Sequence, residues 1–167
     1  QDYWLRDTAG NIIKQDDQIW FLDVGRLGFK ELYADWLLRA LGDCKGIVFD
    51  YWSNRIYTGF VGGFTAGKKI QGYATDEFWQ DKAWKPFISY LMQRLKAAGV
   101  KIVGNNVGLA NDMPIKDFDR SFCDAVIYES FAVDYGGAWL TGQQAAGNIK
   151  TLGIDPKEVW CADSGIR

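Results

Sequence analysis

The alternation of short apolar runs with helix-like segments is the feature that most constrains the fold of this chain. Five runs have the character of β-strands, at residues 19–23, 46–50, 100–106, 124–130 and 155–164. Segments with helical spacing of apolar residues lie between them, at 28–41, at 76–99 with a break or restart at Pro86, and at 140–153. Strands that alternate with helices in this way predict an α/β fold with parallel strands, covered by helices on both faces.

Every one of these predicted strands ends on a carboxylate or an amide. The stretch "KGIVFDYWSN" at 45–54 shows the pattern, because three apolar residues lead directly into Asp50, with Tyr51 and Trp52 behind it. The residues at the strand ends are Asp23, Asp50, Asn105 with Asn106, Glu129 and Asp163. Parallel strands bring their carboxyl ends to one edge, where α/β proteins place their active sites. We therefore expect a polar cleft at that edge.

Composition narrows the chemistry of such a cleft. The 167 residues include no histidine, which excludes Ser-His-Asp and Cys-His catalysis and leaves acid–base work to other side chains. The net charge of −2, without a basic block, argues against a nucleic-acid partner. No apolar run reaches the roughly 18 residues of a membrane span. Eight tryptophans and eight tyrosines suit sugar rings, whose C–H faces stack on aromatic rings.

The segment 55–72 is rich in glycine and is predicted to be a rim loop. Within it, "GGFTAGKK" resembles a phosphate-binding loop but has Lys69 where a Ser or Thr must hold magnesium, so nucleotide binding is disfavoured. We expect no cofactor and no metal. Further aromatic residues that could act as sugar platforms or as core are Tyr57, Trp79 and Trp139.

Two architectures fit five parallel strands. A complete (β/α)8 TIM-type barrel needs about 250 residues, whereas an open five-stranded parallel sheet fits the length. Because the sequence stops at Arg167, just after a strand, we favour an incomplete barrel of about five βα units. Residues 1–167 would then be a single catalytic-type domain within a longer chain, with further chain or subunits completing the barrel.

The order of several short stretches resembles a known family. These stretches are "WLRDTAGNII" (4–13), 19–41, "KGIVFDYWSN" (45–54), "YATDEFWQ" (73–80), "KIVGNNVG" (101–108) and "DAVIYESFA" (124–132). Together they resemble the hypothetical glycosyl hydrolase family 15 group and, more distantly, the endo-α-1,4-polygalactosaminidase families. The resemblance implies a (β/α)8 barrel acting on a polysaccharide, with the acids of the "FD" and "YES" strand ends, Asp50 and Glu129, as the working pair.

Two functions are compatible with this reading. As a glycoside hydrolase, the chain would use Glu129 as general acid and Asp50 as base or nucleophile, or the reverse. Sugar hydroxyls would bind to the polar residues at the strand ends and to nearby rings, which are Asp23, Tyr51, Trp52, Asn105, Asn106 and Asp163. The alternative is a carbohydrate-binding or structural barrel module without turnover. An extracellular, cell-envelope or virion-associated setting is the expectation that follows from a polysaccharide ligand.

Overall fold

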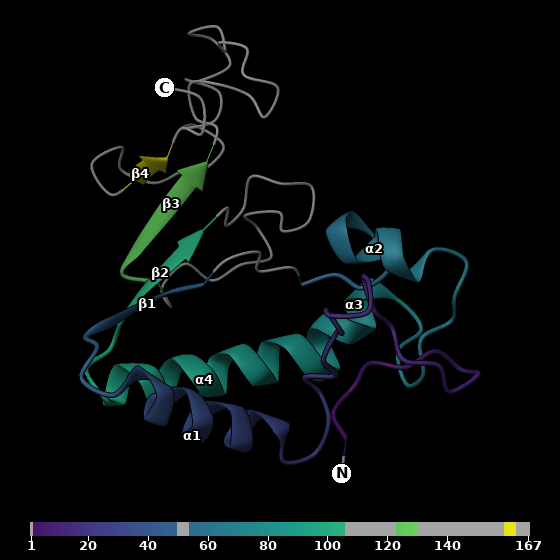
Figure 1. Ribbon diagram of the computed structural model, residues 1–167, viewed down its shortest axis with the longest axis horizontal. Coiled ribbons are helices and arrows are strands. Elements are labelled where there is room, and N and C mark those ends of the chain that lie inside the picture. Colours follow the sequence, from purple (N-terminus) through teal and green to yellow (C-terminus); the bar gives the residue numbers. More distant parts are fainter. Residues whose placement is uncertain (1, 50–53, 106–122, 130–158, 163–167) are drawn as a thin grey trace, which may run out of the picture. The chain divides into compact units, whose positions relative to one another are not determined.

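The computed structural model describes residues 2–49, 54–105, 123–129 and 159–162 (Figure 1). The chain divides into two compact units, Gln1–Lys45 with Ser53–Val100, and Gly46–Trp52 with Lys101–Arg167. The first unit holds the described helices and the second holds a sheet. We describe each unit by itself.

The sheet of the second unit has four parallel strands in the order β1-β2-β3-β4. They are β1 (Gly46–Phe49), β2 (Lys101–Asn105), β3 (Ala125–Glu129) and β4 (Val159–Ala162). Phe49 pairs with Gly104, and Gly104 in turn pairs with Val126, so the register runs across three strands without a break. Four of the five predicted strands are thus confirmed. Continuous apolar runs of this kind are typical of strands in a parallel sheet.

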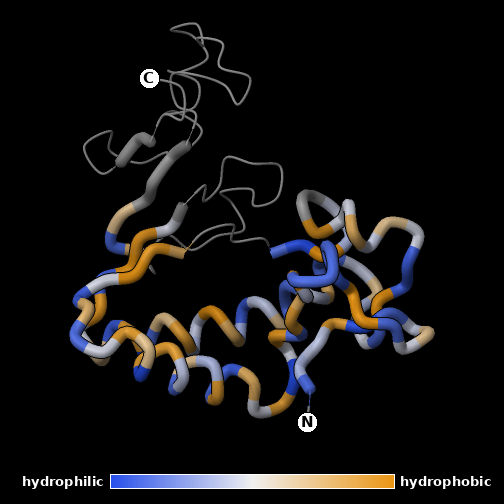
Figure 2. The backbone as a smooth tube through the Cα atoms, in the orientation of Figure 1, coloured by the Kyte–Doolittle hydropathy of each residue, from blue (hydrophilic) through white to orange (hydrophobic). Residues whose placement is uncertain are grey.

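Two long helices form the centre of the first unit. Helix α1 (Phe29–Leu41) and helix α4 (Lys85–Ala97) lie side by side and run in the same direction (Figure 1). Each alternates apolar and polar residues along its length (Figure 2), and the apolar ones that are buried include Phe29, Ala34, Leu37, Phe87, Leu91 and Leu95. At the surface, Arg94 of α4 donates to Asp35 of α1 at 2.7 Å.

The helix that leads into α4 changes its hydrogen bonding before Pro86. Helix α3 (Asp76–Trp79) is capped by Thr75, whose hydroxyl accepts from the Phe78 N–H at 3.2 Å. A π-helical turn, η1 (Gln80–Trp84), follows, and the N–H of Lys85 bonds to the carbonyl of Gln80. Proline has no N–H to give to the preceding turn, so the helix restarts there, as predicted, without ending.

The first predicted strand, 19–23, is not part of the parallel sheet, and this prediction is wrong. The segment forms isolated antiparallel bridges with the N-terminal residues, Trp20 with Lys14 and Leu22 with Trp4. Two turns make this possible: the carboxylate of Asp7 accepts from the Asn11 N–H at 2.8 Å, and that of Asp16 accepts from the Ile19 N–H at 2.9 Å. Asp-centred turns of this kind fold a chain back on itself.

The segment 55–72, predicted as a rim loop, contains a short helix, α2 (Gly59–Thr65). Val61 and Thr65 are one helical turn apart and both are buried, and the Thr65 hydroxyl donates to the Ile56 carbonyl. Gly62 permits the packing, because a Cβ there would lie 2.6 Å from the carbonyl oxygen of Tyr57. The absence of a side chain at Gly62 therefore permits a close backbone contact within the helix.

Candidate functional site

A polar hollow of about 320 Å³ surrounds Asp23 in the first unit. Its walls come from the N-terminal antiparallel ribbon (residues 4–22), the loop before α1, the loop before α3, α3 itself and the π-helical turn. The lining residues are Trp4, Arg6, Asp23, Gly25, Arg26, Gln71, Gly72, Tyr73, Phe78 and Lys82. We call it the Asp23 pocket. One carboxylate, three cations and three aromatic rings therefore meet at one place.

Asp23 is held by a residue fifty positions away. The hydroxyl of Tyr73 donates to Asp23 Oδ1 at 2.6 Å, and the backbone N–H of Gly25 donates to the same oxygen at 3.2 Å. Glycine is required at position 25, because a Cβ there would lie 2.3 Å from the Tyr73 hydroxyl. The second oxygen, Oδ2, has no bond with any residue in the described ranges, so it can accept from a ligand hydroxyl.

The environment of Tyr73 keeps its phenol protonated. Burial of the ring, followed by the hydrogen bond to the carboxylate of Asp23 and its charge, raises the pKa of Tyr73 well above its ordinary value. Its ring meets the buried indole of Trp79 edge to face, with centroids 4.7 Å apart and an interplanar angle of 85°. Tyr73 is therefore a fixed donor to Asp23 at ordinary pH.

Two of the three cations are tied to the N-terminus. Arg6 donates to Oδ2 of Asp2 at 2.8 Å, and Arg26 donates through Nη1 to the carbonyl and to Oδ1 of the same residue, at 2.8 and 3.2 Å. The guanidinium group of Arg6 also lowers the pKa of the Asp2 carboxyl. Within the described part of the chain, Nε and Nη2 of Arg26 have no acceptor and Lys82 has no ion pair.

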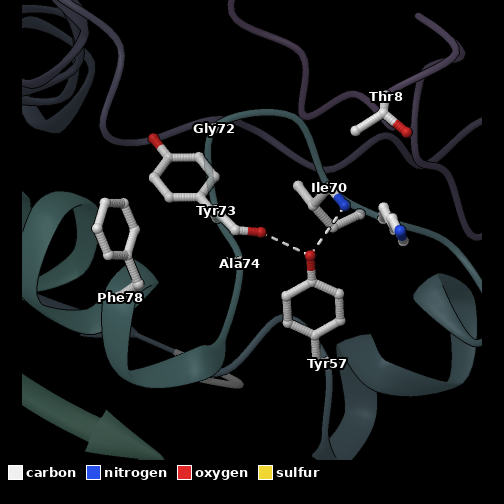
Figure 3. A pocket seen from close by; sticks show the side chains of 8 residues that line it. Thr8, Tyr57, Ile70, Gly72, Tyr73, Ala74 and Phe78 are labelled. Atoms are coloured by element: carbon white, nitrogen blue, oxygen red, sulfur yellow. Dashed lines mark hydrogen bonds between the residues drawn. The ribbon is translucent and has the colours of Figure 1, made fainter.

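A second hollow has a volume of about 520 Å³, and Figure 3 shows the residues that line it. It shares Gly72, Tyr73 and Phe78 with the Asp23 pocket, so the two hollows are neighbours. In this hollow the hydroxyl of Tyr57 donates to the Tyr73 carbonyl at 2.6 Å and accepts from the Ile70 N–H at 2.9 Å. The predicted platform Tyr57 therefore lines a hollow, and its hydroxyl fixes the loop that carries Tyr73.

A buried carboxylate anchors the chain behind this second hollow. Asp76 is 9% exposed, and its oxygens accept from the backbone N–H groups of Ile56 and Tyr57, at 2.7 and 2.8 Å, and from the hydroxyl of Thr58 at 2.7 Å. These bonds tie the segment that follows the "FDYWSN" stretch to the first turn of α3. Asp76 is thus a structural residue that joins two segments of the first unit.

The aromatic residues near the Asp23 pocket include buried and exposed side chains. Trp79 is 4% exposed and packs on Tyr73, so it belongs to the core and cannot face a sugar. Trp4, which lines the Asp23 pocket, contacts Trp20 at a centroid distance of 5.7 Å, and Trp20 is 42% exposed. The aromatic wall of the pocket therefore continues onto the surface.

Two other predicted site residues, Asn105 and Glu129, belong to the sheet of the second unit. Asn105 and Glu129 are the last residues of β2 and β3, and all four strands point the same way, so their carboxyl ends share one edge. Asp50 and Asp163 directly follow β1 and β4 in the sequence. The predicted residues that lie outside the described ranges are Asp50, Tyr51, Trp52, Asn106, Trp139 and Asp163.

Among the residues predicted at the strand ends, Asp23 is the one whose side-chain surroundings are described, and its position differs from the prediction. It does not end a strand of the parallel sheet; it follows the antiparallel ribbon. Arg26, Tyr73 and Lys82 were not predicted as its neighbours, and Tyr73 and Lys82 come from segments far from Asp23 in the chain. The one signal was local: Arg26 lies three residues after Asp23, where it could have been considered as part of a polar loop.

Comparison with known proteins adds no family. No protein-family model matches the sequence, and no curated protein matches it. In the described ranges, no group of three or more acidic, cysteine or histidine side chains could hold a metal ion. None of the helices in these ranges has the length and apolar character that crossing a membrane requires.

Proposed function

We propose that the chain is a glycoside hydrolase that cleaves a polysaccharide with two carboxyl groups, Asp50 and Glu129. The observation that carries the proposal is the parallel sheet, in which β1, followed by Asp50, and β3, ending at Glu129, lie on either side of β2. Strands are about 4.8 Å apart, so the backbones of β1 and β3 are about 10 Å apart. Carboxyl groups that flank a glycosidic bond are about 5–9.5 Å apart.

The order of the strands supports a barrel as the architecture. In a (β/α)8 barrel each strand lies beside the one before it in the sequence, which is the order β1-β2-β3-β4. A doubly wound open sheet reverses its order at a switch point. We accordingly propose a TIM-type barrel, with further chain or subunits supplying strands beyond these four.

The mechanism follows from what two acids can do without histidine. Glu129 protonates the leaving glycosidic oxygen, while Asp50 activates a water or attacks the anomeric carbon. Asn105, Asn106 and Asp163 would hold hydroxyl groups at the same edge. The Asp23 pocket gives independent support for a sugar ligand, since it combines a free carboxylate oxygen, an amide and aromatic rings. A polysaccharide substrate would place the protein outside the cell, in the envelope or on a virion.

A binding module without turnover is the second candidate, and the same pocket favours it. The Asp23 pocket could hold a glycan whether or not the pair at the sheet edge is active. Cleavage of a polysaccharide is therefore the property that separates the two functions.

The test is a hydrolysis assay on the full chain with a panel of neutral, acidic and amino polysaccharides, read as new reducing ends. We expect D50N and E129Q each to lower the rate by about 10²–10⁴-fold, the usual contribution of one acid or base. The matched controls are D43N and E77Q, which change exposed carboxylates of the first unit and should leave the rate unchanged. Full activity in either test variant, or no cleavage of any polysaccharide, overturns the proposal; binding without cleavage supports the binding module.

A further inference from the structure

We infer that the Asp23 pocket binds a carboxylate-bearing sugar, such as a uronic acid unit of an acidic glycan. That the ligand is a glycan rests on the proposed function. That this glycan carries an acid group rests on the pocket itself. Three cations, Arg6, Arg26 and Lys82, line the pocket with the carboxylate of Asp23. Asp2 pairs with Arg6 and Arg26, so one positive charge remains in excess. A neutral sugar has no need of these charges.

Arg26 is prepared to bind a carboxylate with two parallel hydrogen bonds. Asp2 holds only its Nη1 atom, with bonds to the carbonyl and to Oδ1 of that residue. The other edge of the guanidinium group, formed by Nε and Nη2, has no acceptor among the described residues. This planar fork matches the two oxygens of a carboxylate. Because Asp2 already fixes the group, little side-chain freedom is lost on binding.

The remaining polar groups select a hydroxyl-rich ligand over a simple anion. Asp23 repels negative charge, yet its free Oδ2 can accept from hydroxyl groups. A ligand with one carboxylate and several hydroxyls satisfies both sides of the pocket, with the acid near Arg26 and Lys82 and the hydroxyls near Asp23. A compact dianion such as phosphate carries no such hydroxyl face. The ring of Phe78, 44% exposed, and that of Trp4 supply surfaces for the C–H face of the sugar.

A second hollow and an exposed tryptophan ring lie beside the Asp23 pocket. The second hollow shares the wall formed by Tyr73 and Phe78, and Trp20 extends the ring of Trp4 onto the surface. An oligosaccharide is therefore a better probe than a monosaccharide. We choose α-1,4-linked trigalacturonate and its fully methyl-esterified form, which differ in charge and in little else.

The experiment is isothermal titration of the full chain with each trisaccharide. We expect the acid to bind at least about tenfold more tightly than the ester at low salt, which corresponds to one charge-assisted hydrogen-bonded pair. R26Q should lose about tenfold in affinity for the acid, K82Q about threefold, and both losses should shrink at high salt. Neither variant should change binding of the ester by more than the error.

Lys85 provides the matched control. Lys85 lies three residues after Lys82 in the sequence. Its ammonium group pairs with Asp81 at 2.7 Å, and the residue lines neither hollow. K85Q should bind the acid as the parent does. Equal affinities for acid and ester, no binding of the acid, or equal losses in R26Q and K85Q would each overturn the inference.

The outcome is separable from that of the proposed hydrolysis. Selective binding of the acid, with no cleavage of any polysaccharide, leaves the pocket assignment standing and removes the enzyme. Cleavage that depends on Asp50 and Glu129, together with equal binding of acid and ester, does the reverse. A D50N variant that retains selective binding further shows that the two sites are distinct in their chemistry.

Discussion

The hydroxyl of Tyr73 donates a hydrogen bond to Oδ1 of Asp23 at 2.6 Å, although fifty positions separate the two residues in the sequence. The bond joins the loop before α3 to the loop before α1. It also leaves the other oxygen of Asp23 for a ligand. Changes to either residue should therefore affect both the stability of the first unit and the affinity of the Asp23 pocket.

Replacing Tyr73 by phenylalanine removes the donor and keeps the ring. We expect Y73F to lower the free energy of unfolding by about 1 kcal/mol near pH 7. A tyrosine in the unfolded chain loses its proton at a pH of about 10, whereas the pKa of Tyr73 is raised in the folded state. The stability that Tyr73 supplies is therefore complete below that pH and is lost as the pH rises above it.

The measurement for Y73F is urea denaturation of parent and variant at several pH values from 7 to 11. The difference in unfolding free energy should become smaller above pH 10. A difference that stays constant across the range would contradict the assignment of Tyr73 as a protonated donor in the folded protein.

Replacement of Gly25 by any residue with a side chain should destabilise the first unit. A Cβ at this position would lie 2.3 Å from the Tyr73 hydroxyl and 2.7 Å from the Cβ of Ala83. We expect G25A to cost about 1–3 kcal/mol in unfolding free energy, the usual cost of overpacking. The control is G63A, since a Cβ at Gly63, within helix α2, meets nothing within 4 Å. That variant should be neutral or slightly more stable, and equal losses in the two would argue against the close approach.

Asp76 should tolerate amidation poorly. The two carboxylate oxygens accept from three donors, which are the N–H groups of Ile56 and Tyr57 and the hydroxyl of Thr58. An asparagine would replace one of these oxygens by an NH₂ group, which cannot accept. We expect D76N to lose about 1–3 kcal/mol in thermal or urea denaturation. T58V removes one donor and keeps the acceptor, so its loss should be smaller; a D76N variant as stable as the parent would show that these bonds contribute nothing.

The contact between α1 and α4 should depend on its apolar residues far more than on its ion pair. Leu95 is fully buried, whereas the Arg94–Asp35 pair has side chains that are 38% and 49% exposed. We expect L95A to cost about 2–5 kcal/mol and D35N less than about 1 kcal/mol. Comparable losses in urea denaturation would mean that the ion pair is better shielded from solvent than its exposure indicates.

The sequence predicted the parts of the fold that depend on local pattern. The strands that became β1 to β4 are continuous apolar runs, and the helices α1 and α4 repeat their apolar residues every three or four positions. The segment 19–23 was misassigned because a short apolar run suits antiparallel and parallel pairing equally well. The turns at Asp7 and Asp16 were the overlooked signal, since they fold the ribbon back before and after residue 13.

The candidate site was less accessible to prediction, for a physical reason. Asp23 was selected from its place after an apolar run, but its neighbours Tyr73 and Lys82 come from two segments that meet Asp23 only in the folded chain. Spacing along the sequence carries no information on such a meeting. The acids at the sheet edge were selected by the same local argument, and Glu129 does end a strand, as predicted.

The strand order has a consequence for how the protein is made. Each strand of the sheet pairs with the strand that precedes it in the chain, so nothing synthesised later must be inserted between two strands already joined. As the ribosome releases the chain from its N-terminus, β2 can add to β1, then β3 to β2, then β4 to β3. Assembly can therefore keep pace with translation, and each newly emerged strand finds its template already in place.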